Sequence, residues 1–220
     1  LAAHAGDLPA ALAEYEAAAQ PSVRKIQDSA RPSLAWWEHF GRYHDEFEPW
    51  QFAYHFLSRS ITDSRLARRD PGFVAASHRG WVSTHGAEPL DTPFARGGWS
   101  TPGRLVAVTA ADGVPSGVAG GLPLATQPQA GPWGAPVAAP ASEDGLPGVF
   151  ARLDELEGLR PVLVAVHGGT ALTRTLVCEQ ARMHNRLPAL VVDTGEREGL
   201  ADRALTTVLS GRADLVGVPA

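Results

Sequence analysis

The chain has 220 residues, a formal net charge of −5 and a pI near 5.9, so it can form one large core or two small ones and presents no basic face for nucleic acid. No run approaches the roughly 18 apolar residues of a membrane span, and no basic segment leads into an apolar stretch as in a signal peptide. The single cysteine, Cys178, excludes an intrachain disulfide. We therefore expect a cytoplasmic protein with no membrane partner.

The chain begins at Leu1, and its only methionine is Met183. Removal of an initiator methionine usually leaves a small residue at the first position, and leucine is not small. We expect the sequence to be a piece of a longer chain.

Residues 7 to about 82 are predicted to be helical. Asp7 is a suitable N-cap, and Pro9 lies in the first turn, where its missing N–H costs little. Pro21 is expected to kink or break this helix, and Pro32 to end the next one. Further helices are predicted to begin at Pro49 and after Asp70.

Aromatic residues are concentrated in the stretch 33–56. Four of these aromatic residues follow one another at intervals of four, three and four positions, which predicts that they share one face of a helix. We expect that face to pack against other helices or against a domain outside this sequence, with part of it exposed; it comprises Trp36, Phe40, Tyr43 and Phe47.

Residues 86–148 are rich in glycine and proline, and their one strand-like run is 104–110. The stretch is predicted to be either a linker or the remainder of something larger.

Regular order returns in residues 150–220. Three short apolar runs, 161–166, 189–192 and 213–218, are typical of buried parallel strands. Two helical segments separate them, the second of which is expected to stop at Gly211. The pattern predicts an α/β fold whose C-terminal part is a βαβαβ parallel-sheet unit.

Two side-chain patterns have spacings that could suggest a chemical site. His39 and His44 are five residues apart, so a helix would not bring them to one face for a metal, and we treat them and His55 as surface or interface residues. Ser22 and Lys25 have a serine–lysine spacing that is common by chance. We assign no catalytic residue and no metal ligand.

The loops 167–170 and 193–199 follow predicted strands and contain glycine. Such a loop before a helix can bind phosphate, because ligands of parallel sheets lie outside the carboxyl ends of the strands. Glycine is also ordinary in any turn from strand to helix. Both interpretations stay open.

The motifs "SLAWWEHFGRY", "QFAYHFLSRS" and "RLARRDPGFV" occur in that order within residues 7–82. They resemble the bifunctional salicylyl-CoA 5-hydroxylase / anthraniloyl-CoA monooxygenase family, flavoprotein hydroxylases that continue into a barrel similar to old yellow enzyme. The segments 91–117 and 187–219 resemble the start and the end of that barrel. Arg104 stands where the family has asparagine, and Asp193 where it has a phosphate-loop glycine.

The resemblance implies three parts: residues 1–85 as the helical tail of an FAD-dependent monooxygenase, 86–149 as a connection resembling the start of an FMN barrel, and 150–220 as a partial (β/α) barrel. It implies FAD on a missing N-terminal domain, NAD(P)H as electron donor, an aromatic acyl-CoA substrate, and FMN with backbone contacts from Gly195 and Gly217.

Two functions remain in competition. The chain is predicted to be a fragment of a monooxygenase, an oxidoreductase that is not catalytic without its missing part. The alternative is a packing or dimerisation module, with a homodimer as one form.

Overall fold

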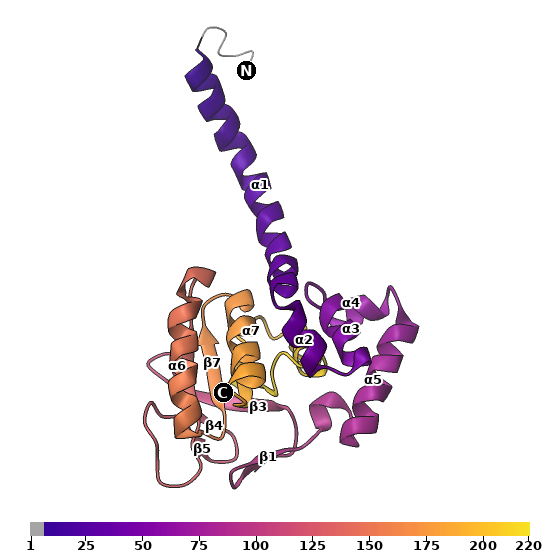
Figure 1. Cartoon of the computed structure of the whole chain (residues 1–220), viewed down its shortest axis with the longest axis vertical. Coiled ribbons are helices and arrows are strands. Elements are labelled where there is room, and N and C mark those ends of the chain that lie inside the picture. The colour runs from indigo at the N-terminus through magenta and orange to yellow at the C-terminus, as the bar shows by residue number, and fades with distance from the viewer. Residues whose placement is uncertain (1–6) are drawn as a thin grey trace. The chain divides into compact units, whose positions relative to one another are not determined.

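The computed structural model describes residues 7–220, which form two units, one ending at Phe40 and one comprising Gly41–Ala220. Figure 1 labels many of the elements along the chain. The helices are α1 (Leu8–Glu38), α2 (Phe40–Glu46), α3 (Pro49–Leu57), α4 (Asp63–Ala67), α5 (Pro71–His85), α6 (Leu146–Leu159), α7 (Ala171–Glu179) and α8 (Leu200–Leu209), with short turns η2 (Pro89–Asp91), η3 (Glu143–Gly145) and η4 (Gln180–His184). The strands are β1 (Phe94–Arg96), β2 (Trp99–Thr101), β3 (Leu105–Ala111), β4 (Val114–Val118), β5 (Leu122–Pro123), β6 (Ala135–Ala139), β7 (Val164–Gly168), β8 (Ala189–Val192) and β9 (Leu215–Pro219).

Helix α1 runs without a break through both of its internal prolines, so the predicted interruptions at Pro21 and Pro32 are wrong. An internal proline costs about 3 kcal/mol in a helix. The segment before Pro21 is rich in alanine, the residue with the highest helix propensity, and the helix continues past the lost hydrogen bond. The predicted cap at its start is confirmed, since the Asp7 carboxylate accepts a bond of 3.1 Å from the Ala10 amide.

The predicted starts of α3 and α5 are also confirmed. Each helix has proline in its first turn. At α5, Asp70 accepts a bond of 2.9 Å from the Phe73 amide, as an N-cap should.

The aromatic face predicted across residues 36–47 is divided, because α1 ends before His39 and α2 begins at Phe40. Trp36 meets Phe40 edge to face at 5.6 Å between ring centres. Tyr43 stacks on Phe47 at 6.2 Å.

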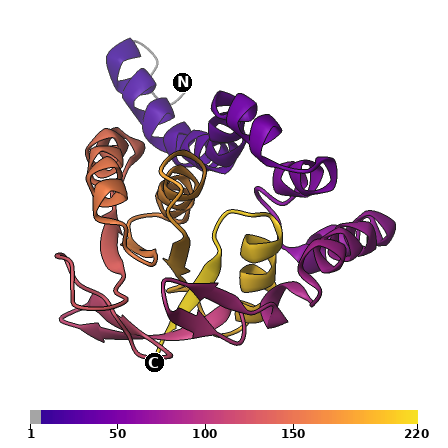
Figure 2. The same ribbon diagram turned by 60° about the horizontal axis from the view of Figure 1, so that its bottom comes forward.

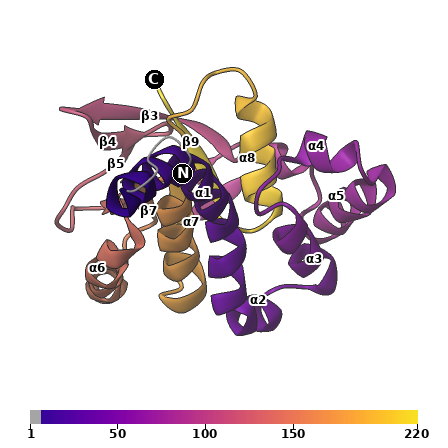
Figure 3. The same ribbon diagram turned by 90° about the horizontal axis from the view of Figure 1, so that it is seen from above.

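The main sheet has seven strands in the order β5-β4-β3-β9-β8-β7-β6. The strands from β3 to β6 in that order pair in parallel, and β4 and β5 join as antiparallel neighbours. The predicted βαβαβ unit is confirmed as β7-α7-β8-α8-β9. Helices α6, α7 and α8 lie along one side of this sheet (Figure 3).

The glycine- and proline-rich middle is part of this sheet and supplies β3, β4, β5 and β6. In Figure 2 the first of these strands, β3 and β4, lie below α6, α7 and α8. The sheet curls so far that Leu124, after β5, forms a bridge with Gly134, before β6. The α/β fold class and the resemblance to part of a barrel are therefore confirmed.

Alternate residues of β8 and β9 belong to two different cores. Leu190, Val192 and Leu215 pack inside the curl with residues of the middle segment, including Trp99 and Val118. Val191 and Val216 face the helices. Side chains therefore fill the inside of the curl.

Between residues 7 and 220, no helix is both long and apolar enough to cross a membrane.

Candidate functional site

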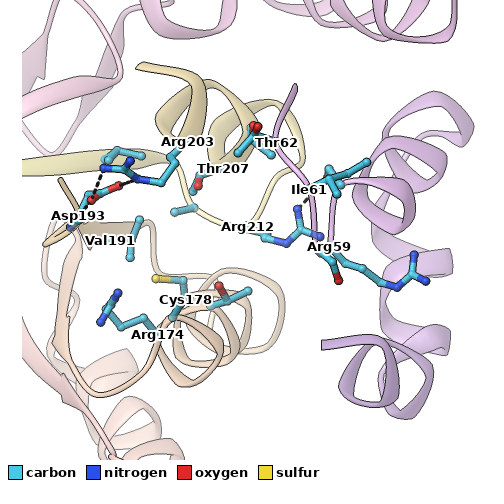
Figure 4. A pocket seen from close by; sticks show the side chains of 18 of the residues that line it. Arg59, Ile61, Thr62, Arg174, Cys178, Val191, Asp193, Arg203, Thr207 and Arg212 are labelled. Carbon is cyan, nitrogen blue, oxygen red and sulfur yellow. Dashed lines mark hydrogen bonds and ion pairs between the residues drawn. The ribbon is translucent and has the colours of Figure 1, made fainter. Parts of the chain in front are cut away.

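The candidate site is a cavity of about 490 Å³ within the Gly41–Ala220 unit (Figure 4). One wall is a face of α7, where the lining residues are three or four positions apart, and the opposite wall is a face of α8. The segment between α3 and α4 closes a third side. The lining residues are Ser58, Arg59, Ser60, Ile61, Thr62, Arg65, Ala171, Arg174, Thr175, Cys178, Val191, Val192, Asp193, Gly195, Arg203, Thr206, Thr207, Arg212, Ala213 and Val216.

The floor of the cavity is apolar. Val191 and Val216 are direct partners in the pairing of β8 with β9, and both contact the helix-side core. Cys178 and Ile61 extend this surface (Figure 4). Burial raises the pKa of the Cys178 thiol, which stays protonated and is not suited to act as a nucleophile.

The rim of the cavity is cationic. Among the described residues that line it, five are arginines and one is a carboxylate, Asp193. The arginines are Arg59, Arg65, Arg174, Arg203 and Arg212. This local excess of positive charge contrasts with the net charge of −5 of the whole chain.

The one carboxylate is neutralised within the protein. Arg203 donates to Asp193 from Nε at 2.9 Å and from Nη2 at 3.1 Å. Burial raises the pKa of Asp193, but these bonds and one from the Gly195 amide outweigh it, and the net shift is downward. Asp193 therefore remains ionised and forms an ion pair with Arg203.

Two other arginines keep donors available. Arg174 donates from Nη1 to the carbonyls of Gly168 and Gly169, at 2.7 and 3.2 Å, which fixes its direction without neutralising its charge. Within residues 7–220, neither Arg174 nor Arg65 has a carboxylate partner within 4.0 Å. An anion entering the cavity would meet these two side chains.

Arg212 also lines the cavity and is held by the end of α3. Its Nη1 donates to Ser58 Oγ at 2.9 Å, and its Nη2 donates to the His55 carbonyl at 2.6 Å. Its Nε lies 3.9 Å from Glu179 Oε1. These three contacts fix the direction of the guanidinium.

Glu179 is buried and joins this arginine to two further side chains. It accepts a bond of 2.5 Å from the Tyr43 hydroxyl, and it lies 3.0 Å from His55 Nε2. Burial raises the pKa of Glu179, yet the bonds from His55 and Tyr43 and the charge of Arg212 lower it overall. Burial, with the Arg212 charge, lowers the pKa of His55 to about 4.

The sequence did not single out Glu179 or Arg212. For Glu179 the sequence offered one signal, because this charged residue directly follows the apolar run "LVC" of a predicted helix. That position indicates a buried charge only if the apolar face of the helix is known to be covered. His55, expected at a surface or an interface, is 1% exposed and bound to Glu179. The surface alternative was wrong, because α3 turns His55 toward α7.

Of the two glycines predicted to contact FMN, Gly195 is at the cavity and Gly217 is not. The Gly195 amide already donates to Asp193 Oδ1 at 2.7 Å. Gly217 lies in β9, where a Cβ atom would come within 2.7 Å of Val108 and Leu190 side-chain atoms. Both FMN contacts stay predictions.

The loop 167–170 caps the N-terminus of α7, the helix that follows it. Thr170 and Thr173 form a capping box, with Thr173 N donating to Thr170 Oγ1 at 3.1 Å. Gly169 has a φ of +53° and lies so close to Pro140 that a Cβ atom would be 2.5 Å from its carbonyl oxygen. These glycines are explained by the turn itself.

The histidines of the aromatic stretch are not assigned as metal ligands by the sequence. His44 is exposed beside Asp45. Within residues 7–220, no group of three or more His, Cys, Asp or Glu side chains is placed to hold a metal ion.

Comparison with known proteins gives one informative match. A salicyloyl-CoA 5-hydroxylase from a Streptomyces species is 47% identical over 219 residues, covering 96% of this chain and 40% of the hydroxylase. The chain thus spans less than half the length of that relative. No family model and no solved structure matches. The resemblance to this hydroxylase family, predicted from the motifs, is confirmed.

Proposed function

We propose that this chain is part of a flavin-dependent monooxygenase that hydroxylates an aromatic acyl-CoA thioester. The observation that carries the proposal is the 47% identity to a salicyloyl-CoA 5-hydroxylase over 96% of the chain. The relative's remaining 60% has no counterpart in these residues and leaves room for an FAD domain.

In this proposal the cofactors lie mainly elsewhere. FAD binds to the missing N-terminal domain, NAD(P)H supplies the electrons, and the bound flavin supplies the oxygen chemistry. Residues 1–85 form the tail of the FAD part, and residues 86–149 and 150–220 form a reduced barrel. FMN remains a secondary part of the proposal, because the amide of Gly195 and the space beside Gly217 are both occupied by the protein itself.

The chain's own contribution is to bind and orient. The cationic rim and the aliphatic floor between α7 and α8 suit a ligand with both charged and apolar parts. Holding the thioester in a fixed direction relative to the flavin lowers the entropic part of the barrier, and a covered site keeps water from the reaction.

The proposal is tested on the longer protein that carries this chain. Purified enzyme is supplied with salicyloyl-CoA, NAD(P)H and oxygen, and the product is analysed by mass spectrometry. We expect a thioester heavier by one oxygen atom, formed only when the thioester is present. Consumption of NAD(P)H with no hydroxylated thioester would contradict the proposal.

One observation favours the alternative of a packing or dimerisation module. Helix α1 exposes apolar side chains along most of its length, and these are Leu8, Leu12, Tyr15, Val23, Ile26, Leu34 and Trp37. Sedimentation of the 220-residue chain over a range of concentrations separates the two ideas. A stable homodimer favours the module, whereas a monomer that binds the separately produced FAD part favours the enzyme.

A further inference from the structure

We infer that the cavity between α7 and α8 binds the phosphorylated part of a CoA thioester, with Arg65 and Arg174 as its anion-binding residues. The inference rests on the proposed function for the identity of the ligand. It rests on the structure for the location and for the two arginines.

The lining of the cavity carries an excess of positive charge. Among the described lining residues, five arginines face one carboxylate, and that carboxylate is paired with Arg203. A cavity with low-dielectric walls and one sign of charge concentrates ligands of the opposite sign. The ligand of this cavity is therefore an anion.

Three of the five lining arginines are engaged within the protein, and one of them, Arg59, donates to the Phe56 carbonyl at 2.7 Å. Arg203 is occupied by Asp193 and by the carbonyls of Glu196 and Glu198. Arg212 is turned inward toward Glu179 and Ser58. Arg174 and Arg65 come from α7 and α4, on different walls, and have no carboxylate partner within the described residues.

The two available guanidinium groups suit a ligand with phosphate or carboxylate oxygens. Arginine presents a planar set of N–H donors that matches phosphate and carboxylate oxygens in pairs. Arg174 is pre-oriented, since its Nη1 is bound to two carbonyls while Nε and Nη2 have no partner among residues 7–220. A pre-oriented donor loses little entropy when a ligand binds.

The apolar floor of the cavity suits a ligand that also has an apolar part. The floor consists of Val191, Val216, Cys178 and Ile61, and none of the described lining residues is aromatic. Free phosphate would leave this surface unused. A ligand with phosphate groups and an aliphatic chain, which are both present in CoA, uses the rim and the floor together, and 490 Å³ lies in the usual range for organic ligands, about 300–1,000 Å³.

The test is isothermal titration of the full 220-residue chain with CoA, salicyloyl-CoA, salicylate, inorganic phosphate and FMN in turn. We expect CoA and salicyloyl-CoA to bind with similar affinity, salicylate not to bind, and phosphate to compete weakly. Binding of CoA should weaken as salt is added, because charge attraction is screened. Absence of CoA binding, or FMN binding tightly where CoA does not, would overturn the inference.

The variants Arg65→Ala and Arg174→Ala identify the site. Each removes charge-assisted hydrogen bonds and should weaken CoA binding about ten-fold or more. Arg79→Ala is the matched control, since Arg79 is exposed on α5 and does not line the cavity; it should leave affinity within about two-fold. Unchanged CoA affinity in both cavity variants would overturn the assignment.

Arg65 has no hydrogen bond or ion pair within residues 7–220, so Arg65→Ala remains informative if Arg174→Ala fails to fold. Arg174→Lys keeps the charge but not the paired donors, and should recover part of the lost affinity. Failure of this site and of the proposed function are also distinguishable. CoA binding without hydroxylation by the longer protein contradicts the function alone, and hydroxylation whose KM for the thioester is unchanged in both variants contradicts the site alone.

Discussion

The hydroxyl group of Tyr43 donates a 2.5 Å hydrogen bond to Glu179, a residue 136 positions later in the chain, and both side chains are buried. The bond joins α2 to the last residue of α7. Through Glu179 it also reaches Arg212, which lines the cavity. The helical segment and the parallel-sheet unit therefore share a buried polar cluster, consisting of Tyr43, His55, Glu179 and Arg212.

Removal of the carboxylate from this cluster should destabilise the fold. Glu179→Ala leaves the Arg212 charge inside the protein without its partner, which costs about 3–5 kcal/mol. Tyr43→Phe removes one donor and should cost about 1–3 kcal/mol. Unfolding in urea measures both values. Tyr15→Phe, at a side chain 65% exposed, is the control and should change almost nothing.

The stability of the fold should fall as the pH drops from 6.5 to about 4 because of His55. Burial lowers the pKa of His55 to about 4, so the unfolded chain takes up a proton on this ring at a pH where the folded chain does not. The loss across this window is roughly 3 kcal/mol at most. Glu179 acts in the same direction at lower pH, because its pKa is depressed in the folded state.

The measurement is the unfolding free energy of the wild type and of His55→Gln at several pH values. The variant should lose the pH dependence between 6.5 and 4. His78 provides a contrast, because its bond with Asp63 raises its pKa and its contribution is lost as the pH rises above 6.5. An unchanged acid limb in His55→Gln would contradict the assignment.

Substitution of Gly217 should reduce stability by overpacking. A Cβ atom at this position would lie 2.5 Å from Val108 Cγ2 and 2.7 Å from Leu190 Cδ2, so Gly217→Ala should cost about 1–3 kcal/mol. Gly148→Ala is a matched control in α6, where no atom lies within 4 Å, and it should stabilise by up to about 1 kcal/mol. If Gly217→Ala instead kept full stability and weakened FMN binding, the FMN prediction would gain support.

The exposed face of α1 should matter only when the FAD part of the proposed enzyme is present. We propose that the FAD part of the longer protein covers Leu12 and Ile26, which are 53% and 67% exposed. Leu12→Glu with Ile26→Glu should leave the thermal unfolding of the 220-residue chain nearly unchanged and prevent its co-purification with the FAD part. Arg24→Glu, at another exposed position on the helix, is the control. Equal co-purification of all variants would contradict the proposed surface.

The parallel unit was predictable because its strands are continuous apolar runs and its helices carry one apolar face. The run 189–192 coincides with β8, and the helix predicted to stop at Gly211 ends two residues before it. Strand β6 was missed because alanine and proline make up most of "APVAA" and both have low strand propensity. It forms through its pairing with β7, which local sequence does not reveal.

The cavity could be predicted only in part. The loop 193–199 was identified as a possible phosphate site, and Asp193 and Gly195 do line the cavity. The five arginines come from the segment between α3 and α4, from α4, α7 and α8, and from the residues before β9, so their meeting depends on tertiary packing. Arg104, noted as a departure from the family, instead bonds the carbonyls of Thr92 and Asp214 at 3.0 and 3.2 Å and is explained by structure.

The most direct test of the account is a crystal structure of this chain with salicyloyl-CoA. We predict electron density for phosphate groups between the guanidinium groups of Arg65 and Arg174, with the aliphatic part of CoA lying over Val191 and Val216. Density for the thioester at another surface, with this cavity empty, would contradict it.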